Sequence, residues 1–350
     1  MARHFKERNA PAETKKSPPR AKRKRSPRQV IYSLLLVVFA GVFLFSGWML
    51  LQNLWIKPAQ NQAVNDDIRD IFSQAMETTV TDDDSQGSTT GQESTAEGQD
   101  AYDIREGLRR SEAVRYLAEN VNSDIVGWIT VDGTVIDYPV LQSSVEDDEY
   151  YLKRNYKKQY SSYGSIFLDS YCSTAGDMQV LYGHSMNDGS MFRSLISFGE
   201  PGVVAASPVI QYDTAGESSQ WLIISVFKTN TLPSQGEIFS YIRTGFSYSQ
   251  DKLEYLYQVM QRSMVNTHVG VNESDDLLLL STCSYEFSDF RTVVVARRLR
   301  EGEALPAVNV TYAEHTLYPD CWYQKYGGSA YPWPQTFGEA QAQGLIDWYR

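Results

Sequence analysis

Cysteine and histidine are scarce in this chain of 350 residues, which has three of the former and four of the latter. The cysteines are Cys172, Cys283 and Cys321, and no two of them form a CxxC pair. This spacing argues against a structural zinc site, and we expect neither a metal nor a cofactor. Sequence alone does not decide whether Cys172 and Cys321 form a disulfide or all three thiols are free.

Positive charge is concentrated at one end of the chain. The formal net charge is −11, but residues 1–29 carry a balance of +9 and the remaining 321 residues a balance of −20. Such asymmetry is typical of a role at nucleic acid or at a membrane. An acidic main part would repel phosphates, so nucleic acid is excluded as its partner. We interpret residues 1–29 as a disordered basic tail.

One long apolar run follows this tail. Residues 30–51 read VIYSLLLVVFAGVFLFSGWMLL and contain no charge, and a membrane-spanning helix needs about 20 apolar residues. We predict a transmembrane helix over 30–54. The alternative is a cleaved signal peptide, whose apolar region is shorter and ends in small residues, unlike the bulky end of this run. Since basic flanks stay in the cytoplasm, we expect a single-pass cell-membrane protein with its N-terminus inside and its main part extracellular.

Residues 55–101 are predicted to be an acidic, flexible extracellular tether. The stretch TTVTDDDSQGSTTGQESTAEGQD within it has too little apolar content to fold. The preceding piece NDDIRDIFSQAME has apolar residues at a spacing that allows a short helix.

The globular part is expected over 102–300. Leu108, Val114 and Leu117 fall at a helical period within 104–120, and a second amphipathic helix fits 250–264. Many short strand-like runs point to a barrel or sandwich with a few helices, and Asp132-Gly133 marks a hairpin turn between the first two. The runs are GWITV, VIDYPVL, SIFLD, MQVLYGH, PVIQYD, WLIISVFKT, DLLLLSTCS and RTVVVARRL.

Cys283 is the candidate nucleophile because it follows four leucines that end in Ser281-Thr282, at the expected mouth of a buried strand. Only the thiolate attacks, so a base or cation must lie nearby. The bland alternative is an inert core cysteine.

His184 is the candidate acid/base partner, since it follows another strand run. His4 would be cytoplasmic, His315 lies in an atypical tail, and His268 reads as a solvated loop residue. A structural role for His184 is the alternative.

Arg291 begins the strand run after Cys283. If these two strands are antiparallel neighbours, Arg291 and Cys283 share one end of the sheet, where the guanidinium could stabilise an oxyanion. Otherwise it is an ordinary strand-end arginine paired with Glu286 or Asp289.

Three motifs together resemble those of class B sortases. YGHSMNDGSMF, STCSYEF and DFRTVVVARRL match that family's His, Cys and Arg motifs, in the same order. The N-terminal anchor, the segment DDEYYLKRNY and the helix expected at 250–264 fit as well. The resemblance covers about residues 102–300. Members usually stop soon after the Arg strand, so the aromatic-rich residues 301–350 are an extension that could pack on the domain, cap a groove or contact a partner.

The resemblance implies a closed eight-stranded β-barrel and a cysteine transpeptidase. Cys283 would cut an LPxTG- or NPxTx-like sorting signal after its Thr, with His184 as acid/base and Arg291 as the transition-state cation. Ser281 and Thr282 would contribute to substrate binding. The implied partners are secreted proteins with a C-terminal sorting signal and an amine acceptor, either a peptidoglycan precursor or another pilin subunit.

Two other functions compete with this one. A membrane-tethered cysteine peptidase or peptidoglycan hydrolase would use the same thiol and histidine, but such enzymes usually place Cys before His and use Asn or Asp as the third residue. A non-enzymatic surface scaffold would need no thiol chemistry.

Overall fold

The computed structural model describes residues 27–78, 104–305 and 309–350. The chain divides into two compact units, residues 1–56 and 57–350. Most of the expected basic tail and residues 79–101 of the expected tether lie outside the described residues.

The described part of the first unit is helical. It contains α1 (Pro27–Leu51) and a π-helical turn, η1 (Gln52–Ile56), and the apolar side chains of α1 are exposed. Among the described residues, the N-terminal helical stretch is the one candidate membrane span by length and composition. This agrees with the predicted transmembrane helix.

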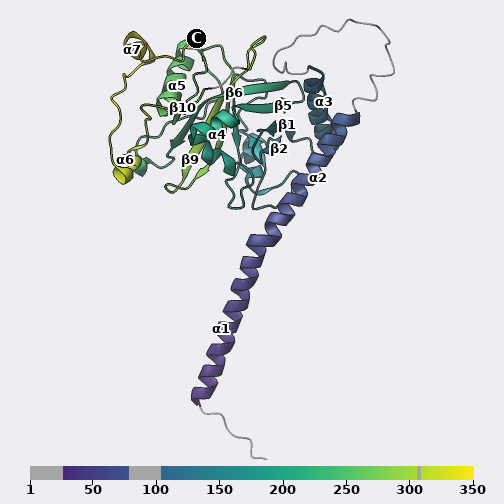
Figure 1. The fold of residues 1–350 in the computed structure, drawn as a ribbon. Coiled ribbons are helices and arrows are strands. Elements are labelled where there is room, and N and C mark those ends of the chain that lie inside the picture. Colours follow the sequence, from purple (N-terminus) through teal and green to yellow (C-terminus); the bar gives the residue numbers. More distant parts are fainter. Residues whose placement is uncertain (1–26, 79–103, 306–308) are drawn as a thin grey trace, which may run out of the picture. The chain divides into compact units, whose positions relative to one another are not determined.

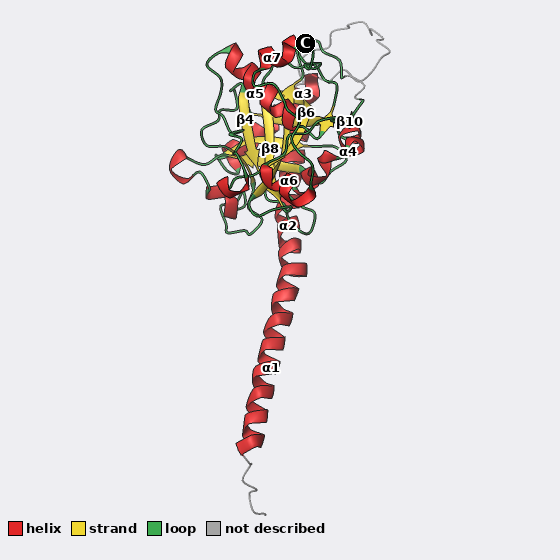
Figure 2. Ribbon diagram, turned by 90° about the vertical axis from the view of Figure 1, so that its left-hand side faces the viewer, coloured by secondary structure: helices red, strands yellow, loops and turns green. Residues whose placement is uncertain are grey.

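The second unit is built on a closed barrel of eight strands, as predicted, in the order β1-β2-β3-β4-β8-β9-β6-β5 (Figures 1 and 2). Each of the eight predicted runs overlaps one strand. The pairs β2–β3 and β4–β8 are parallel and the others antiparallel. The strands are β1 (Ile125–Thr130), β2 (Asp137–Leu141), β3 (Ile166–Leu168), β4 (Met178–Tyr182), β5 (Val209–Thr214), β6 (Ser218–Thr229), β8 (Leu277–Ser284) and β9 (Phe290–Arg298).

β8 and β9 each contain a continuous apolar run because both of their faces are covered there. Leu277–Leu280 and Val293–Val295 are fully buried, and such continuous apolar runs are typical of strands without a solvated face. The predicted turn between β1 and β2 is also present, with Gly133 at a φ of 75° that glycine adopts without strain.

Two helices cover one side of the barrel, α2 (Lys57–Thr78) and α3 (Ile104–Asn120) (Figure 1). Phe72 of α2 stacks on Trp128 of β1 with ring centroids 4.2 Å apart, a contact worth roughly 0.5–1.5 kcal/mol beyond simple burial. Ile68 is also fully buried. Residues 57–78 therefore differ from the expected flexible tether, because their apolar stripe packs against the barrel.

The remaining helices lie in the connections and in the C-terminal extension. Helix α5 matches the predicted helix before the Cys strand. The short elements of the extension pack back onto the unit: β10 pairs with β7, and Phe337 and Trp348 join the main core. These elements are α4 (Pro201–Ala206), α5 (Ser249–Arg262), β7 (Val265–Asn266), β10 (Thr311–Tyr312), α6 (Asp320–Tyr326) and α7 (Phe337–Ala342), with the 3-10 turns η2 (Val145–Asp147), η3 (Tyr150–Lys153), η4 (Arg193–Gly199) and η5 (Pro233–Gln235).

Candidate active site

Three neighbouring strands bring the predicted catalytic residues to one end of the barrel. β8 and β9 are antiparallel, and their register places Cys283 directly opposite Arg291. β4 runs parallel to β8 with Tyr182 opposite Ser281, so His184 follows β4 at the level where β8 reaches Cys283. The Gly183 N–H donates to the Ser281 carbonyl at 3.2 Å and extends this alignment.

A cavity of about 420 Å³ opens at this end of the barrel. Its lining includes all five residues selected from the sequence: His184, Ser281, Thr282, Cys283 and Arg291. His268 and His315, which the sequence analysis set aside, do not line it.

Cys283 is the accessible thiol of the chain. It is half-buried, whereas Cys172 and Cys321 are buried, and none of the three forms a disulfide. Burial raises the pKa of Cys172 to about 11 and also raises the pKa of Cys321. Both therefore remain protonated thiols near neutral pH, and only Cys283 lies in a cavity lined by a histidine and an arginine.

His184 is held by its backbone and its ring. Its Nε2 lies 2.8 Å from the Leu152 carbonyl oxygen in η3, and because a carbonyl can only accept, Nε2 carries the proton in this contact. Nδ1 is therefore the nitrogen available for proton transfer. The preceding Gly183 has no room for a side chain, since a Cβ there would lie 2.5 Å from Ile166.

Arg291 keeps most of its guanidinium available. Its one hydrogen bond in the described part of the chain runs from Nη1 to the Phe290 carbonyl, at 3.1 Å. The alternative pairing with Glu286 is not formed, because Glu286 instead pairs with buried Lys228. Asp289 forms no ion pair with Arg291 within the described residues. The remaining N–H groups can thus reach an anionic group in the cavity.

The two residues before Cys283 have buried side chains that are engaged within the protein. Thr282 Oγ1 donates to the Gly183 carbonyl at 2.7 Å and so joins the Cys strand to the His segment. Ser281 Oγ lies 2.9 Å from the Tyr241 hydroxyl. Burial raises the pKa of Tyr241, which stays a neutral phenol under the site.

Sequence reasoning missed several residues that line the cavity. Tyr241 comes from the long connection between β6 and α5, where no periodicity marks it. Asp148, Glu149 and Asp169 also line the cavity. Nothing in the sequence pattern indicated that these residues share a cavity with Cys283, because they come from connections whose path depends on the closed barrel.

Known proteins resemble this chain in sequence and in structure. No family model matches the chain. Sortase B of Listeria monocytogenes is 34% identical over 257 residues, which cover 73% of this chain and 89% of that protein. Sortase B of Staphylococcus aureus is 33% identical over 186 residues, 52% of this chain and 73% of that protein. Among solved structures, a Staphylococcus aureus sortase B–substrate complex superimposes with a TM-score of 0.56 and 26% identity, covering 70% of this chain and 99% of that one.

The relatives, the barrel and the cavity agree with one another. The level of identity and the share of the Listeria relative that is covered are sufficient to establish the family. The chain belongs to the class B sortases and is a sortase-type cysteine transpeptidase.

Proposed function

We propose that Cys283 is the nucleophile, His184 the general acid/base and Arg291 the oxyanion-stabilising cation of this transpeptidase. The observation that carries this proposal is the register of β8 and β9, which sets Cys283 opposite Arg291 in a cavity that His184 also lines. Directly opposed residues of an antiparallel pair have Cβ atoms about 4.5–5.5 Å apart. This separation lets one substrate carbonyl meet both side chains.

In the first half-reaction the Cys283 thiolate attacks the Thr carbonyl of the sorting signal, with His184 as an imidazolium that carries protons on both Nε2 and Nδ1. A C–S bond forms and the carbonyl oxygen becomes an oxyanion, to which Arg291 donates hydrogen bonds. The C–N bond then breaks, and His184 gives the proton on Nδ1 to the departing amine. The product is a thioester on Cys283 and a released C-terminal peptide.

In the second half-reaction an amine attacks the thioester. His184 Nδ1 takes the proton of the amine, the new C–N bond forms, and the C–S bond breaks to return the thiolate. Splitting the exchange into two acyl transfers replaces one difficult step by two easier ones. The protonation state of His184 at the end equals that at the start.

The acidic rim suits an amine substrate. Asp148 and Glu149 are exposed, line the cavity, and lie in the short segment between η2 and η3. Opposite charge raises the local concentration of a protonated amine and favours its capture. We therefore infer that these carboxylates attract the acceptor or a basic residue of the signal.

The proposed substrates are secreted proteins with an LPxTG- or NPxTx-like signal, joined to a peptidoglycan precursor or to another pilin subunit. The similar Staphylococcus aureus structure is a sortase B–substrate complex, which supports a substrate-binding role for the same fold here. The apolar N-terminal helix would hold the enzyme in the cell membrane with its basic flank in the cytoplasm. Confinement with a membrane-linked substrate raises their effective concentration.

A peptide panel tests the proposal. Fluorogenic peptides with LPxTG-like and NPxTx-like motifs are incubated with the enzyme, with and without triglycine as the amine, and products are identified by mass. We expect cleavage after Thr and a triglycine-ligated product, both lost in Cys283→Ala and His184→Ala variants that keep the wild-type melting temperature. Cleavage without any ligated product would favour the peptidase alternative, and unchanged products from Cys283→Ala would remove Cys283 from catalysis.

A further inference from the structure

The hairpin that joins β8 to β9 controls how Cys283 and Arg291 face each other. These two residues are paired directly, so the seven residues 284–290 form the whole connection between nucleophile and cation. Asp289 within it adopts a φ of 55°, a left-handed conformation that is uncommon for a residue other than glycine. A short turn with such a residue needs contacts from outside itself to keep one geometry.

Helix α6 of the C-terminal extension supplies an aromatic stack against this hairpin. The Trp322 ring lies nearly parallel to Tyr318, with centroids 4.2 Å apart, and to Phe290, at 6.4 Å. Phe287 lies 6.3 Å from Trp322 and 5.0 Å from Phe290. Phe290 is fully buried and immediately precedes Arg291, so Trp322 packs one residue away from the proposed cation.

Polar contacts hold the other arm of the hairpin. Lys325 Nζ donates to the Glu286 carbonyl at 2.9 Å and lies 4.7 Å over the Phe287 ring. The Glu286 carboxylate accepts from Ser284, the residue after Cys283, and pairs with Lys228 beneath the hairpin. One lysine of α6 therefore connects to the residue next to the nucleophile through a single intermediate residue, Glu286.

The segment that leads into helix α6 is bonded to the domain. Thr316 Oγ1 donates to the Ser263 carbonyl at 2.9 Å and Leu317 N to the Gln261 carbonyl at 2.8 Å. Asp320, the first residue of α6, approaches Gly236 so closely that a Cβ on Gly236 would lie 2.8 Å from its amide nitrogen. The start of α6 is thus anchored to the domain.

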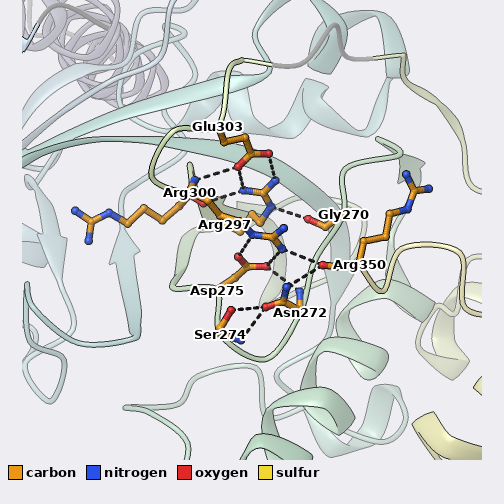
Figure 3. Close-up of polar contacts among 9 residues, drawn as sticks. Gly270, Asn272, Ser274, Asp275, Arg297, Arg300, Glu303 and Arg350 are labelled. Carbon is orange, nitrogen blue, oxygen red and sulfur yellow. Dashed lines mark hydrogen bonds and ion pairs between the residues drawn. The ribbon is translucent and has the colours of Figure 1, made fainter. Parts of the chain in front are cut away.

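The end of the extension is held as firmly, at a separate place. Asn272 and Arg300 donate to the Arg350 carbonyl at 2.8 and 3.1 Å, and Arg300 pairs with buried Asp275 (Figure 3). Helix α7 packs near α5, away from α6 (Figure 1). Removing a contact of α6 should therefore leave the rest of the extension in place.

We infer that α6 positions the catalytic hairpin: Trp322 and Lys325 hold the turn between β8 and β9 so that Arg291 stays in register with Cys283. This inference rests on the catalytic roles proposed above for those two residues. Trp322 and Lys325 act through the hairpin and are positioning residues. Helix α6 then supports the catalytic hairpin, a role that the rest of the extension does not share.

Trp322→Ala tests the inference, with Trp333→Ala as its matched control. Trp333 is an aromatic residue of the same extension that packs on Tyr331 and Tyr257, and neither it nor those partners line the catalytic cavity. We expect Trp322→Ala to lower kcat roughly 10- to 100-fold with little change in KM, as for a small misplacement of catalytic groups. Trp322→Phe, which keeps an aromatic ring, should recover most of the loss, and Trp333→Ala should keep the wild-type kcat.

Alkylation of Cys283 provides a readout that is independent of turnover. The rate of iodoacetamide labelling at Cys283, followed by peptide mass spectrometry against pH, should change in Trp322→Ala and stay constant in Trp333→Ala. If Trp322→Ala does not fold, Lys325→Met is judged by the same two measurements. Wild-type kcat and labelling in either folded variant would overturn the inference. A wild-type enzyme that yields no ligated product would instead contradict the proposed function.

Discussion

Replacing Arg291 by lysine separates an oxyanion role from a merely structural one. The guanidinium offers five N–H donors in a planar fork, and the structure commits one nitrogen, Nη1, to the Phe290 carbonyl. Lysine keeps the positive charge but has a single ammonium that cannot repeat this geometry. Loss of one oxyanion donor costs about 100- to 1000-fold in kcat, or about 2.7–4 kcal/mol, and we expect a fall in kcat of this size.

Stability should hardly change in the same variant. Arg291 has no ion pair in the described part of the chain, and substitutions of that kind usually fall within about 0.5 kcal/mol. For a protein of this size that corresponds to roughly 1–2 °C in melting temperature. Arg298→Lys is the matched control: it lies on the same strand, pairs with Glu217 and Asp276, and does not line the cavity.

The assay measures kcat and KM with the fluorogenic peptide and triglycine, beside thermal unfolding of each variant. A low kcat with an unchanged melting temperature for Arg291→Lys, and near-normal kcat for Arg298→Lys, supports the assignment. An Arg291→Lys kcat within about threefold of wild type would refute the reasoning, since the predicted loss is at least 100-fold.

Thr282→Val removes the hydroxyl that donates to the Gly183 carbonyl. The variant should lose about 1–3 kcal/mol of unfolding free energy, measured by urea unfolding. An unchanged urea midpoint would contradict this structural role and favour a role of Thr282 in substrate binding. Burial alone would raise the pKa of Glu286. Hydrogen bonds from Lys228 and Ser284 outweigh this effect and hold the pKa below its usual range. This contribution to stability is complete above about pH 4.3, the unfolded-state pKa, and is lost as pH falls through the lower folded-state value. Glu286→Gln should therefore lose less stability than wild type between pH 7 and pH 3, and an equal loss in both proteins would contradict that cause. Brief iodoacetamide treatment of the folded enzyme should label Cys283 ahead of Cys172, whose pKa is raised by burial, and comparable labelling of both would show that burial does not protect Cys172.

The strands of the barrel were predictable because their signals are local. Leu277–Leu280 and the valines of RTVVVARRL predict buried strands from their own apolar character, before any neighbouring strand is known. The turn at Asp132-Gly133 is similarly encoded in two residues. Strand-end positions, the exclusion of the other histidines and the joint match to three family motifs together grouped Cys283, His184 and Arg291.

What the sequence did not reveal depends on contacts between distant segments. Residues 57–78 have few apolar positions, and their helix packs on the barrel through contacts with distant residues, such as Phe72 with Trp128. Tyr241 reaches Ser281 from a connection 40 residues away. The aromatic extension lacks periodicity, since its side chains fit pre-existing surfaces and form no face of their own. Contacts in which one side chain fits a distant side chain leave no repeating pattern in a single sequence.

Trapping the covalent intermediate tests the central claim most directly. The enzyme is mixed with a sorting-signal peptide in the absence of any amine, quenched in acid, and digested for mass spectrometry. We predict a thioester on Cys283 whose acyl part ends at the Thr of the signal, and its disappearance, with a ligated product, when triglycine is added. A peptide that is cleaved with no adduct on Cys283, or with the adduct on another residue, would contradict the account.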